Sequence, residues 1–448
     1  MFGNLKCGWK GFIAFKSVLL ILCLAVPAGA SNNETDHCGF LEQTLRKIDF
    51  TLLGAHVDWK DRLRLVSREK AVKIQIGGIV MLDTGYTGSD SELERGFPGL
   101  RGYNTDFRRL RLNTFTTLYD TVDIKFEIDF ARIREIKDIW VGLRSLPVVG
   151  DLRVGHMKEP FSLEELASST NLTFMERALS TLVFAPSRDV GIMCQNTALE
   201  ERMTWSAGAF MLTGSFSDVG NAKDQLSDIF GYAFTGRITG LPWHTEDGTR
   251  LMHVGLSYTY QDRNEQRESS WLKVSALPES YLTDKRLVNT GLFFTGSVHM
   301  INPEWAVVLG PLSFQAEYVQ AFVNAGTAGD PGFWGGYLYG SYFLTGEHRR
   351  YDMKKGIFSQ VTPNDNFQFS GGGWGAWELG LRVSYVDLNG GNIRGGKEGN
   401  LTAGLNWYID PNIRIMFNYI HADVRDRAAP LIDNGNADIF QGRFQLNF

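Results

Sequence analysis

The last ten residues of the chain, Ile439–Phe448, have the pattern of one β-strand with two unlike faces. Successive side chains of a strand point to opposite sides. The alternation therefore gives an apolar face and a polar face, formed by Phe440, Phe444, Leu446 and Phe448 on one side and by Gln441, Arg443, Gln445 and Asn447 on the other. A half-buried strand of a soluble sandwich alternates in the same way. A transmembrane β-barrel also requires it, because its last strand closes the ring between lipid and a wet lumen.

The first thirty residues favour the barrel. Lys6, Lys10 and Lys16 precede the apolar run Val18–Val26, and Ala28-Gly29-Ala30 follows as a cleavage pattern. This order is typical of a secretory signal peptide over residues 1–30, and the apolar run is too short to span a bilayer. No later stretch of about 20 apolar residues exists, so a barrel is the remaining way for the exported chain to be integral to a membrane.

Alternation recurs along the chain. Its clearest example is Val122–Phe130, which places five apolar residues on one face and four charged residues on the other. Phe107–Leu118 alternates too, and the turn Tyr119–Thr121 joins the two as a hairpin. The sequence predicts sixteen strands: Val72–Thr87, Asp106–Tyr119, Thr121–Arg132, Lys137–Pro147, Gly150–Lys158, Ser187–Thr197, Arg202–Gly214, Leu226–Gly240, Arg250–Asp262, Val298–Leu309, Pro311–Ala325, Gly332–Thr345, Gly373–Leu388, Gly396–Ile409, Asn412–Arg425 and Asn436–Phe448.

An all-β fold follows, namely a transmembrane antiparallel β-barrel over residues 72–448, with residues 31–71 as a periplasmic N-terminal segment. With sixteen strands, all the short turns fall on one side, as periplasmic turns do. Counting Trp271–Leu277 as a further spanning strand breaks that parity, so we assign it to a long outer loop, Arg263–Ser297. Glu159–Pro186 and Gly346–Gly372 are also long connections, and we expect both to fold into the lumen and narrow it.

The chain resembles the phosphate-selective porin O and P family of bacterial outer-membrane channels. The resemblance runs from about Val72 to Phe448, and it rests on the order of several loose motifs: Phe107–Leu112, Asp123–Ala131, Val154–Phe161 leading into Leu163-Glu164, Met175–Arg177, Pro278–Ser280, Gly310–Ser313 and Gly375–Leu379. It implies a sixteen-stranded homotrimeric barrel with loops folded into the pore. It also implies that arginines and lysines along the pore give a preference for anions.

Fixed positive charge along a narrow channel attracts anions, and arginine suits phosphate because its planar fork donates two parallel hydrogen bonds. By alternation, the residues expected to face the ion path are Arg109, Arg111, Lys125, Arg144, Arg153, Arg237, Arg382, Arg414 and Arg443. The resemblance favours Arg109, Arg111 and Arg153 among them. A basic cluster near the periplasmic exit would be formed by Arg349, Arg350, Lys354 and Lys355. The alternative interpretation is that these are ordinary solvated charges paired with acids.

The expected function is a porin in the bacterial outer membrane for passive diffusion of small solutes, with phosphate or polyphosphate as the leading anions. Asp123, Glu127 and Asp129 share the lumen face, so a weakly selective general porin stays open. A structural or adhesive outer-membrane barrel is a further alternative. We expect Phe448 to be an assembly signal for the barrel-assembly machinery, and outer-membrane lipid to surround the wall.

Other classes of function find no support in the sequence. Its eight histidines are scattered without a catalytic motif, so we expect no enzyme, and we expect no cofactor and no metal site. The formal net charge is −5, and it becomes −8 without the three lysines of the leader, which argues against a nucleic-acid partner. Only Cys38 and Cys194 would remain in the mature chain, and whether they pair stays open.

Overall fold

The computed structural model describes residues 56–59, 63–131, 135–213, 231–263 and 271–448. The expected signal peptide at residues 1–30 and Cys38 lie outside these ranges. Among the described residues, no helix combines the length and the apolar character that crossing a membrane requires.

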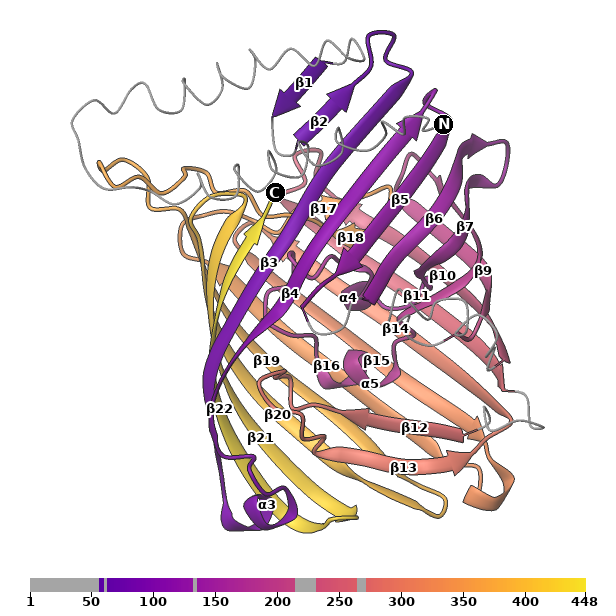
Figure 1. Ribbon diagram of the computed structural model, residues 1–448, viewed down its shortest axis with the longest axis vertical. Helices are drawn as coiled ribbons and strands as arrows, with labels where there is room; N and C mark the ends of the chain where they lie inside the picture. Colours follow the sequence, from indigo (N-terminus) through magenta and orange to yellow (C-terminus); the bar gives the residue numbers. More distant parts are fainter. Residues whose placement is uncertain (1–55, 60–62, 132–134, 214–230, 264–270) are drawn as a thin grey trace, which may run out of the picture. The chain divides into compact units, whose positions relative to one another are not determined.

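Within the described residues, one antiparallel sheet closes on itself as a sixteen-stranded barrel, as predicted, and two short strands extend it (Figure 1). Closure is made by the first and last strands of the ring, whose register runs from Ile79 opposite Asn447 to Ser89 opposite Ala437. The wall strands are β3 (Val72–Ser89), β4 (Gly102–Leu118), β5 (Val122–Asp129), β6 (Glu135–Leu146), β7 (Gly150–Lys158), β8 (Arg188–Ala198), β9 (Met203–Met211), β10 (Gly231–His244), β11 (Arg250–Arg263), β14 (Ser297–Leu309), β15 (Leu312–Asn324), β16 (Gly332–Phe343), β19 (Ala376–Gly390), β20 (Ile393–Tyr408), β21 (Ile413–Ala428) and β22 (Leu431–Asn447).

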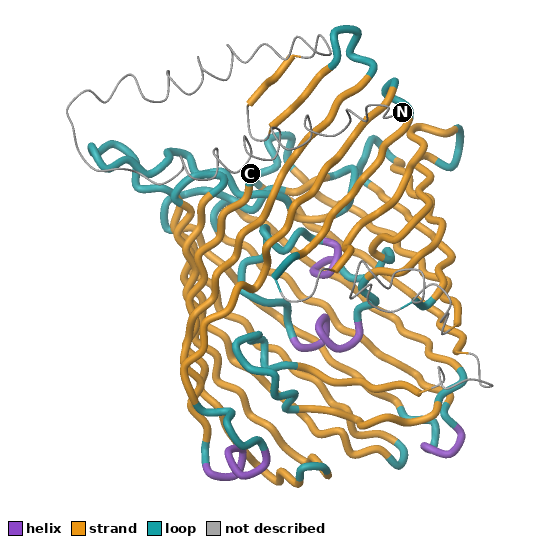
Figure 2. Tube along the Cα trace, viewed as in Figure 1, coloured by secondary structure: helices purple, strands orange, loops and turns teal. Residues whose placement is uncertain are grey.

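The remaining described elements lie in the connections or precede the wall. β12 (Trp271–Ala276) pairs only with β13 (Val288–Phe294), so the assignment of Trp271–Leu277 to a loop is confirmed. The others are β1 (His56–Trp59), β2 (Leu63–Val66), α3 (Ser91–Gly96), α4 (Leu163–Leu166), α5 (Leu179–Phe184), the 3-10 turn η3 (Gly326–Ala328), β17 (Tyr351–Asp352) and β18 (Ile357–Phe358). Figure 2 shows α4 and α5 inside the ring of strands.

The wall has the two faces that alternation predicts. Large apolar side chains are exposed on its outside along most strands, including Leu112 on β4, Ile139 on β6, Leu256 on β11, Leu381 on β19 and Phe417 on β21. Exposed apolar side chains at every second position form the surface that lipid requires. The alternate positions face inward, where polar and charged side chains predominate.

The closing seam continues beyond the last wall strand. The backbone N–H of Phe448 donates to the Gly78 carbonyl at 3.1 Å, and the N–H of Gly78 donates to the Phe448 carbonyl at 2.9 Å. A Cβ at position 78 would lie 2.4 Å from the Phe448 ring, so glycine leaves the space that this ring occupies. Past that point β2 pairs with the start of β3, from Leu63 opposite Ile76 to Val66 opposite Lys73. The sequence patterns did not predict β1 and β2.

Deleting Phe448 should impair assembly, because the closing strand loses two backbone hydrogen bonds of about 1 kcal/mol each and the packing of its ring on Gly78. We expect a several-fold smaller fraction of folded barrel in heat-modifiable gel mobility. Phe448→Tyr keeps the aromatic ring and serves as the matched control. An unchanged folded fraction after the deletion would refute a role for this residue in assembly.

Candidate functional site

The connection between β7 and β8, Glu159–Pro186, crosses the lumen as predicted; we name it the constriction segment. Most of its apolar residues are buried inside the barrel, Phe161, Leu163 and Leu179 fully so. At the start of α4, the backbone N–H groups of Leu163 and Glu164 donate to the Glu317 carboxylate of β15, at 3.0 and 2.8 Å. The segment is therefore fixed to the wall at its first turn of helix.

Three of the predicted ion-path arginines hold the other half of this segment. Arg414 donates to the carbonyls of Leu172 and Thr173 at 2.7 and 3.0 Å, and Arg382 donates to the Glu176 carbonyl at 2.9 Å. Arg443 donates to the carbonyl of Met175 and lies 2.5 Å from the Glu176 carboxylate. These three guanidinium groups are almost completely buried, so they contact protein where alternation alone suggested open water.

Three arginines lie within 4.0 Å of the Glu176 carboxylate, namely Arg108, Arg109 and Arg443. Arg108 contacts both its oxygens, at 2.7 and 3.0 Å, and Arg109 lies 3.9 Å away. Burial acts to raise the pKa of Glu176, but the charges of Arg108 and Arg443 outweigh it and hold that pKa well below its usual range. A carboxylate with a depressed pKa keeps its stabilising effect above the ordinary glutamate range and loses it only in strong acid.

Arg108 was not among the predicted residues, because strict alternation places it on the lipid face. The ladder between β3 and β4 shifts between Met81 and Leu82, which pair with Arg109 and Phe107, so Arg108 is the extra residue of a β-bulge. A bulge turns a side chain away from its expected side. Here it directs two successive arginines inward. Two arginines in a row on an otherwise alternating strand are the signal that could have revealed it.

A second connection also enters the lumen with its described part, residues 271–296, which was not predicted. We name its part Leu277–Leu287 the outer segment. Glu279 of this segment is fully buried, and its carboxylate accepts from Arg382 of β19 at 2.6 Å and from Thr402 of β20 at 2.8 Å. Farther along, the Arg427 side chain of β21 donates to the Arg286 carbonyl at 2.6 Å. In the sequence, only the position of Glu279 between Pro278 and Ser280 could have indicated that the segment contacts Arg382.

The connection between β16 and β19 contains Gly346–Gly372, which we name the inner segment, and it enters from the end with short turns, as predicted. Arg349 is buried, donates to Gln315 of β15 at 3.0 Å and lies 3.6 Å from the Phe358 ring centre. Tyr351 hydrogen-bonds His253 of β11 at 2.6 Å. The predicted basic cluster is therefore divided, because Arg350, Lys354 and Lys355 are exposed whereas Arg349 is not.

Arg237, another predicted residue, is buried under the inner segment. It forms an ion pair with Glu304 of β14 at 2.7 Å and donates to the Gly356 carbonyl at 2.8 Å. With Arg109, Arg382, Arg414 and Arg443, it makes five arginines of the predicted ion path that are buried. The three inward segments pack mainly against the side of the barrel formed by β10–β22, whose inward polar side chains are almost all buried. The constriction segment also contacts β4 through Arg108.

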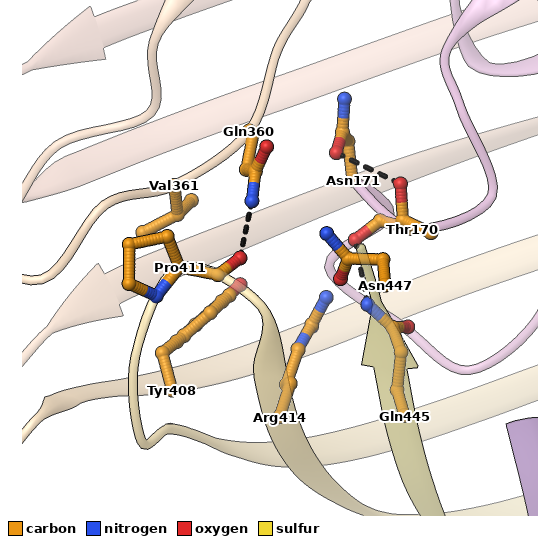
Figure 3. A pocket seen from close by; sticks show the side chains of 9 residues that line it. All are labelled: Thr170, Asn171, Gln360, Val361, Tyr408, Pro411, Arg414, Gln445 and Asn447. Atoms are coloured by element: carbon orange, nitrogen blue, oxygen red, sulfur yellow. Dashed lines mark hydrogen bonds between the residues drawn. The ribbon is translucent and has the colours of Figure 1, made fainter. Parts of the chain in front are cut away.

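A small cavity shows how tightly this side is closed (Figure 3). It lies where the constriction segment, the inner segment and the ends of β20–β22 meet, and its volume is about 10 Å³, the space of one water molecule. Gln360 donates to the Pro411 carbonyl and Gln445 donates to the Thr170 carbonyl beside it. Its lining residues are Thr170, Asn171, Gln360, Val361, Tyr408, Pro411, Arg414, Gln445 and Asn447.

The opposite wall, β4–β8, differs because six of its inward bases are at least partly exposed. We name these bases the cationic wall: Arg111, Lys125, Lys137, Arg144, Arg153 and Arg188. Arg111 lies between Glu127 at 2.9 Å and Asp129 at 2.7 Å, and Lys125 lies 2.6 Å from Asp138. The other contacts join Arg188 to Asp138 at 3.1 Å, Arg144 to Asp123 at 3.5 Å, Lys137 to Glu135 at 2.5 Å and the Arg153 guanidinium to the Trp140 ring at 4.8 Å.

In these pairs the base generally lies nearer the open lumen than its acid. The side chain of Lys125 is 30% exposed against 5% for Asp138, and that of Arg144 is 45% exposed against 13% for Asp123. Lys137 and Glu135 are the exception, since there the acid is the more exposed partner. The difference is clear at Lys125 and Arg144, whereas Arg111 and its two acids are about equally exposed. Lys137 and Arg188 were not predicted as site residues.

The two ends of the constriction segment meet at a pair of carboxyl groups. Glu159, at the start, is fully buried, accepts from Thr235 Oγ1 and lies in hydrogen-bonding contact with Asp189 at the start of β8. Asp189 in turn accepts from the N–H and hydroxyl of Thr213, at 2.7 and 3.1 Å. Burial, and then the charge of Asp189, raises the pKa of Glu159 to about 8.

This pair predicts a pH dependence. The folded protein keeps the Glu159 proton up to about pH 8, whereas an unfolded chain releases it near pH 4.3, so the folded state binds more protons between these values (about 4.3 is the reference for glutamate). Stability should therefore fall as pH rises through this window, by at most about 1.4 kcal/mol per pH unit. Thermal unfolding in detergent between pH 6 and pH 9 measures it.

Glu159→Gln is the control for this prediction, since glutamine keeps the hydrogen bond from Thr235 but does not titrate. Its melting temperature should vary less with pH than that of the native protein over the same range. Parallel curves for the two proteins would mean that Glu159 does not carry the dependence.

Comparison with known proteins agrees with this architecture. A profile described as phosphate-selective porin O and P matches residues 84–448. Porin O of Pseudomonas aeruginosa is 25% identical over 485 aligned positions, which cover 98% of this chain and 99% of that protein. A protein of Caulobacter vibrioides without an assigned function is 27% identical over 401 positions, covering 88% of this chain and 77% of its own length.

Among solved structures, the outer membrane channel DcaP of Acinetobacter baumannii matches with a TM-score of 0.53 and 10% identity. The match covers 86% of this chain and 99% of that one. At this identity the likeness shows the fold alone.

Proposed function

This chain belongs to the phosphate-selective porin O and P family, and on that premise we propose that its lumen passes small anions by passive diffusion, with phosphate or polyphosphate as the leading solutes. It is an outer-membrane porin. The proposal concerns which ions it prefers and which wall they follow. We place the path along the cationic wall of β4–β8, opposite the side that the three inward segments fill.

The observation that carries the proposal is the layering of charge on that wall. Lys125 and Arg144 stand above Asp138 and Asp123, so a passing ion meets the bases first. A charge in a narrow channel with walls of low dielectric acts more strongly than one in bulk water. An anion close to the wall is therefore attracted by the bases. At longer distance the attraction is weaker, because the acids beneath the bases cancel much of the positive charge.

The same acids support a second candidate, a weakly selective general porin. Arg111 and Lys125 each contact carboxylates directly, which reduces the net field they produce. These ion pairs could stay intact while a solute passes. Anions would then be distinguished from cations only by the N–H donors of Arg111 and Lys125 that the carboxylates do not use. The two candidates differ in the size of the anion preference, and both use the same path.

Planar-bilayer recording decides between them. In a KCl gradient, a reversal potential on the anion side supports the proposal, and one near zero supports the general porin. Adding phosphate to one chamber should then reduce the chloride current in a concentration-dependent manner. A cation-side reversal potential would refute the anion preference and leave the porin assignment in place.

Three expectations about the assembled protein belong to the same proposal. We expect a homotrimer, because the family resemblance implies one, and cross-linking in membranes measures it. We expect delivery by a signal peptide at residues 1–30 and insertion by the barrel-assembly machinery. Outer-membrane lipid would then cover the exposed apolar side chains of the wall.

A further inference from the structure

We propose that Glu279 positions the constriction segment, so that the outer segment and the constriction segment hold their places in the lumen as one unit. Glu279 belongs to the connection between β11 and β14, whereas the constriction segment joins β7 to β8. Along the chain, the two connections are separated by the wall strands from β8 to β11. The Glu279 side chain is a direct polar contact between them, beside the apolar packing of α5 against β12.

The carboxylate of Glu279 has four donors. Its Oε1 accepts from the backbone N–H of Leu179 at 3.1 Å and from the Ser384 hydroxyl, and its Oε2 accepts from Arg382 at 2.6 Å and from the Thr402 hydroxyl at 2.8 Å. Ser384 and Arg382 lie on β19, and Thr402 lies on β20. One buried side chain thus joins the outer segment to the wall and to the constriction segment.

Leu179 is the first residue of α5, and its N–H needs an acceptor. The residue before the helix is Ala178, whose side chain cannot cap it, and the structure gives this helix no side-chain cap of its own. Ser, Thr, Asp or Asn normally supplies that acceptor. Here Glu279 supplies it from a different connection. The position of α5 therefore depends on a residue 100 positions away in the chain.

Arg382 reinforces the coupling, because the same guanidinium contacts both segments. It donates to Glu279 at 2.6 Å and to the Glu176 carbonyl at 2.9 Å, and it lies 3.5 Å from the Glu164 carboxylate. Without Glu279, this buried guanidinium would lose its shortest charge contact. Removing one member of a buried ion pair leaves the other charge uncompensated, which is strongly destabilising.

The backbone at Glu279 adds an independent observation. Its φ is +52°, in the left-handed region that residues other than glycine rarely adopt. Such conformations persist where the surroundings fix them, and they cluster at functional positions. The Glu279 carbonyl accepts from Gln441 of β22 at 3.2 Å, so the wall holds both the backbone and the side chain. The conformation brings the carboxylate to α5.

A labelling experiment tests the coupling without relying on conduction. Ser180 lies in α5, next to Leu179, and is fully buried. We would introduce Ser180→Cys into the full chain with Cys38 and Cys194 replaced by serine, and expose the folded protein in vesicles to a maleimide that does not cross membranes. Adding Glu279→Gln should raise the labelling rate of the thiol introduced at position 180 by about tenfold or more, because α5 loses its charged partner.

Glu398→Gln is the matched control. Glu398 is also a fully buried, inward-facing glutamate of the same barrel, but neither of its carboxylate oxygens has a hydrogen-bond partner among the described residues. Its replacement makes the same change of side chain at a residue without a contact to Leu179, and it should leave the labelling rate unchanged. Equal labelling in the Glu279→Gln and Glu398→Gln proteins would overturn the proposal, since α5 would then keep its place without Glu279.

A second readout rests on the proposed function. Glu279→Gln channels should show a larger single-channel conductance than native channels, whereas Glu398→Gln channels should not. Heat-modifiable mobility selects the folded protein for both measurements. Faster labelling in channels that pass no ions would support the coupling and refute the porin role. Unchanged labelling in conducting channels would refute the coupling and leave the porin role intact.

Discussion

Replacing Glu176 with glutamine should release the constriction segment and lower the free energy of unfolding by about 3–5 kcal/mol. Glu176 is 2% exposed and compensates the buried charges of Arg108 and Arg443. Glutamine keeps the shape and one acceptor oxygen but removes the charge. Arg108 would then lose its ion pair, and Arg443 would keep only its pair with Asp83. The segment that carries residue 176 would lose its strongest contacts with the wall.

Chemical unfolding in detergent measures the loss, and a double-mutant cycle identifies its origin. Arg108→Met removes the base whose ion pair is with Glu176. If their contact carries the effect, the combined loss should be smaller than the sum of the single losses by about 0.5–3 kcal/mol. Glu200→Gln, at an exposed turn, is the control and should change little. Additive losses would mean that Glu176 acts through other partners.

Reversing the two most exposed charges of the cationic wall should shift selectivity from anions toward cations. In the double variant Lys125→Glu and Arg144→Glu, new carboxylates would face the lumen above Asp138 and Asp123. Several carboxylates close together repel a passing anion strongly in a narrow channel. We expect the anion-to-cation permeability ratio to fall on the order of tenfold, measured as the reversal potential in a KCl gradient.

A matched control is available on the outside of the barrel. Lys397 and Arg425 are also one lysine and one arginine, each paired with an aspartate, at 2.8 Å from Asp426 and 2.6 Å from Asp423. The double variant Lys397→Glu and Arg425→Glu makes the same change in charge without touching the lumen. Its permeability ratio should match the native value. An equal shift in both double variants would show that the effect is not local to the path.

The strands could be predicted from the sequence because alternation is a local property with a period of two. Val122–Phe130 shows its lipid and lumen faces without any knowledge of its neighbours. The short turns fixed the parity, and parity excluded Trp271–Leu277 from the wall. The register of β22 against β3 and the pairing of β2 beyond Phe448 required the structure, because they depend on partners from the other end of the chain.

The site could be predicted only in part, for a physical reason. Alternation predicts that an arginine points into the barrel, but it does not predict which residues the arginine contacts inside. Arg443 meets Glu176, 267 positions away, and Arg382 meets Glu279, 103 positions away. A bulge changed the side on which Arg108 lies. The inward loops pack mainly on one side of the barrel, so Arg237, Arg382, Arg414 and Arg443 donate to these loops. The bases of the opposite wall stay partly exposed.

We expect ions to follow the β4–β8 wall, because the inward segments fill the β10–β22 side. Thiol blocking tests it most directly, in channels whose native cysteines are replaced by serine. A bulky, negatively charged methanethiosulfonate should block current through Lys125→Cys channels. It should leave current unchanged in Ala306→Cys channels, because Ala306 faces inward from β14 but is fully buried. Block at residue 306 without block at residue 125 would contradict the account.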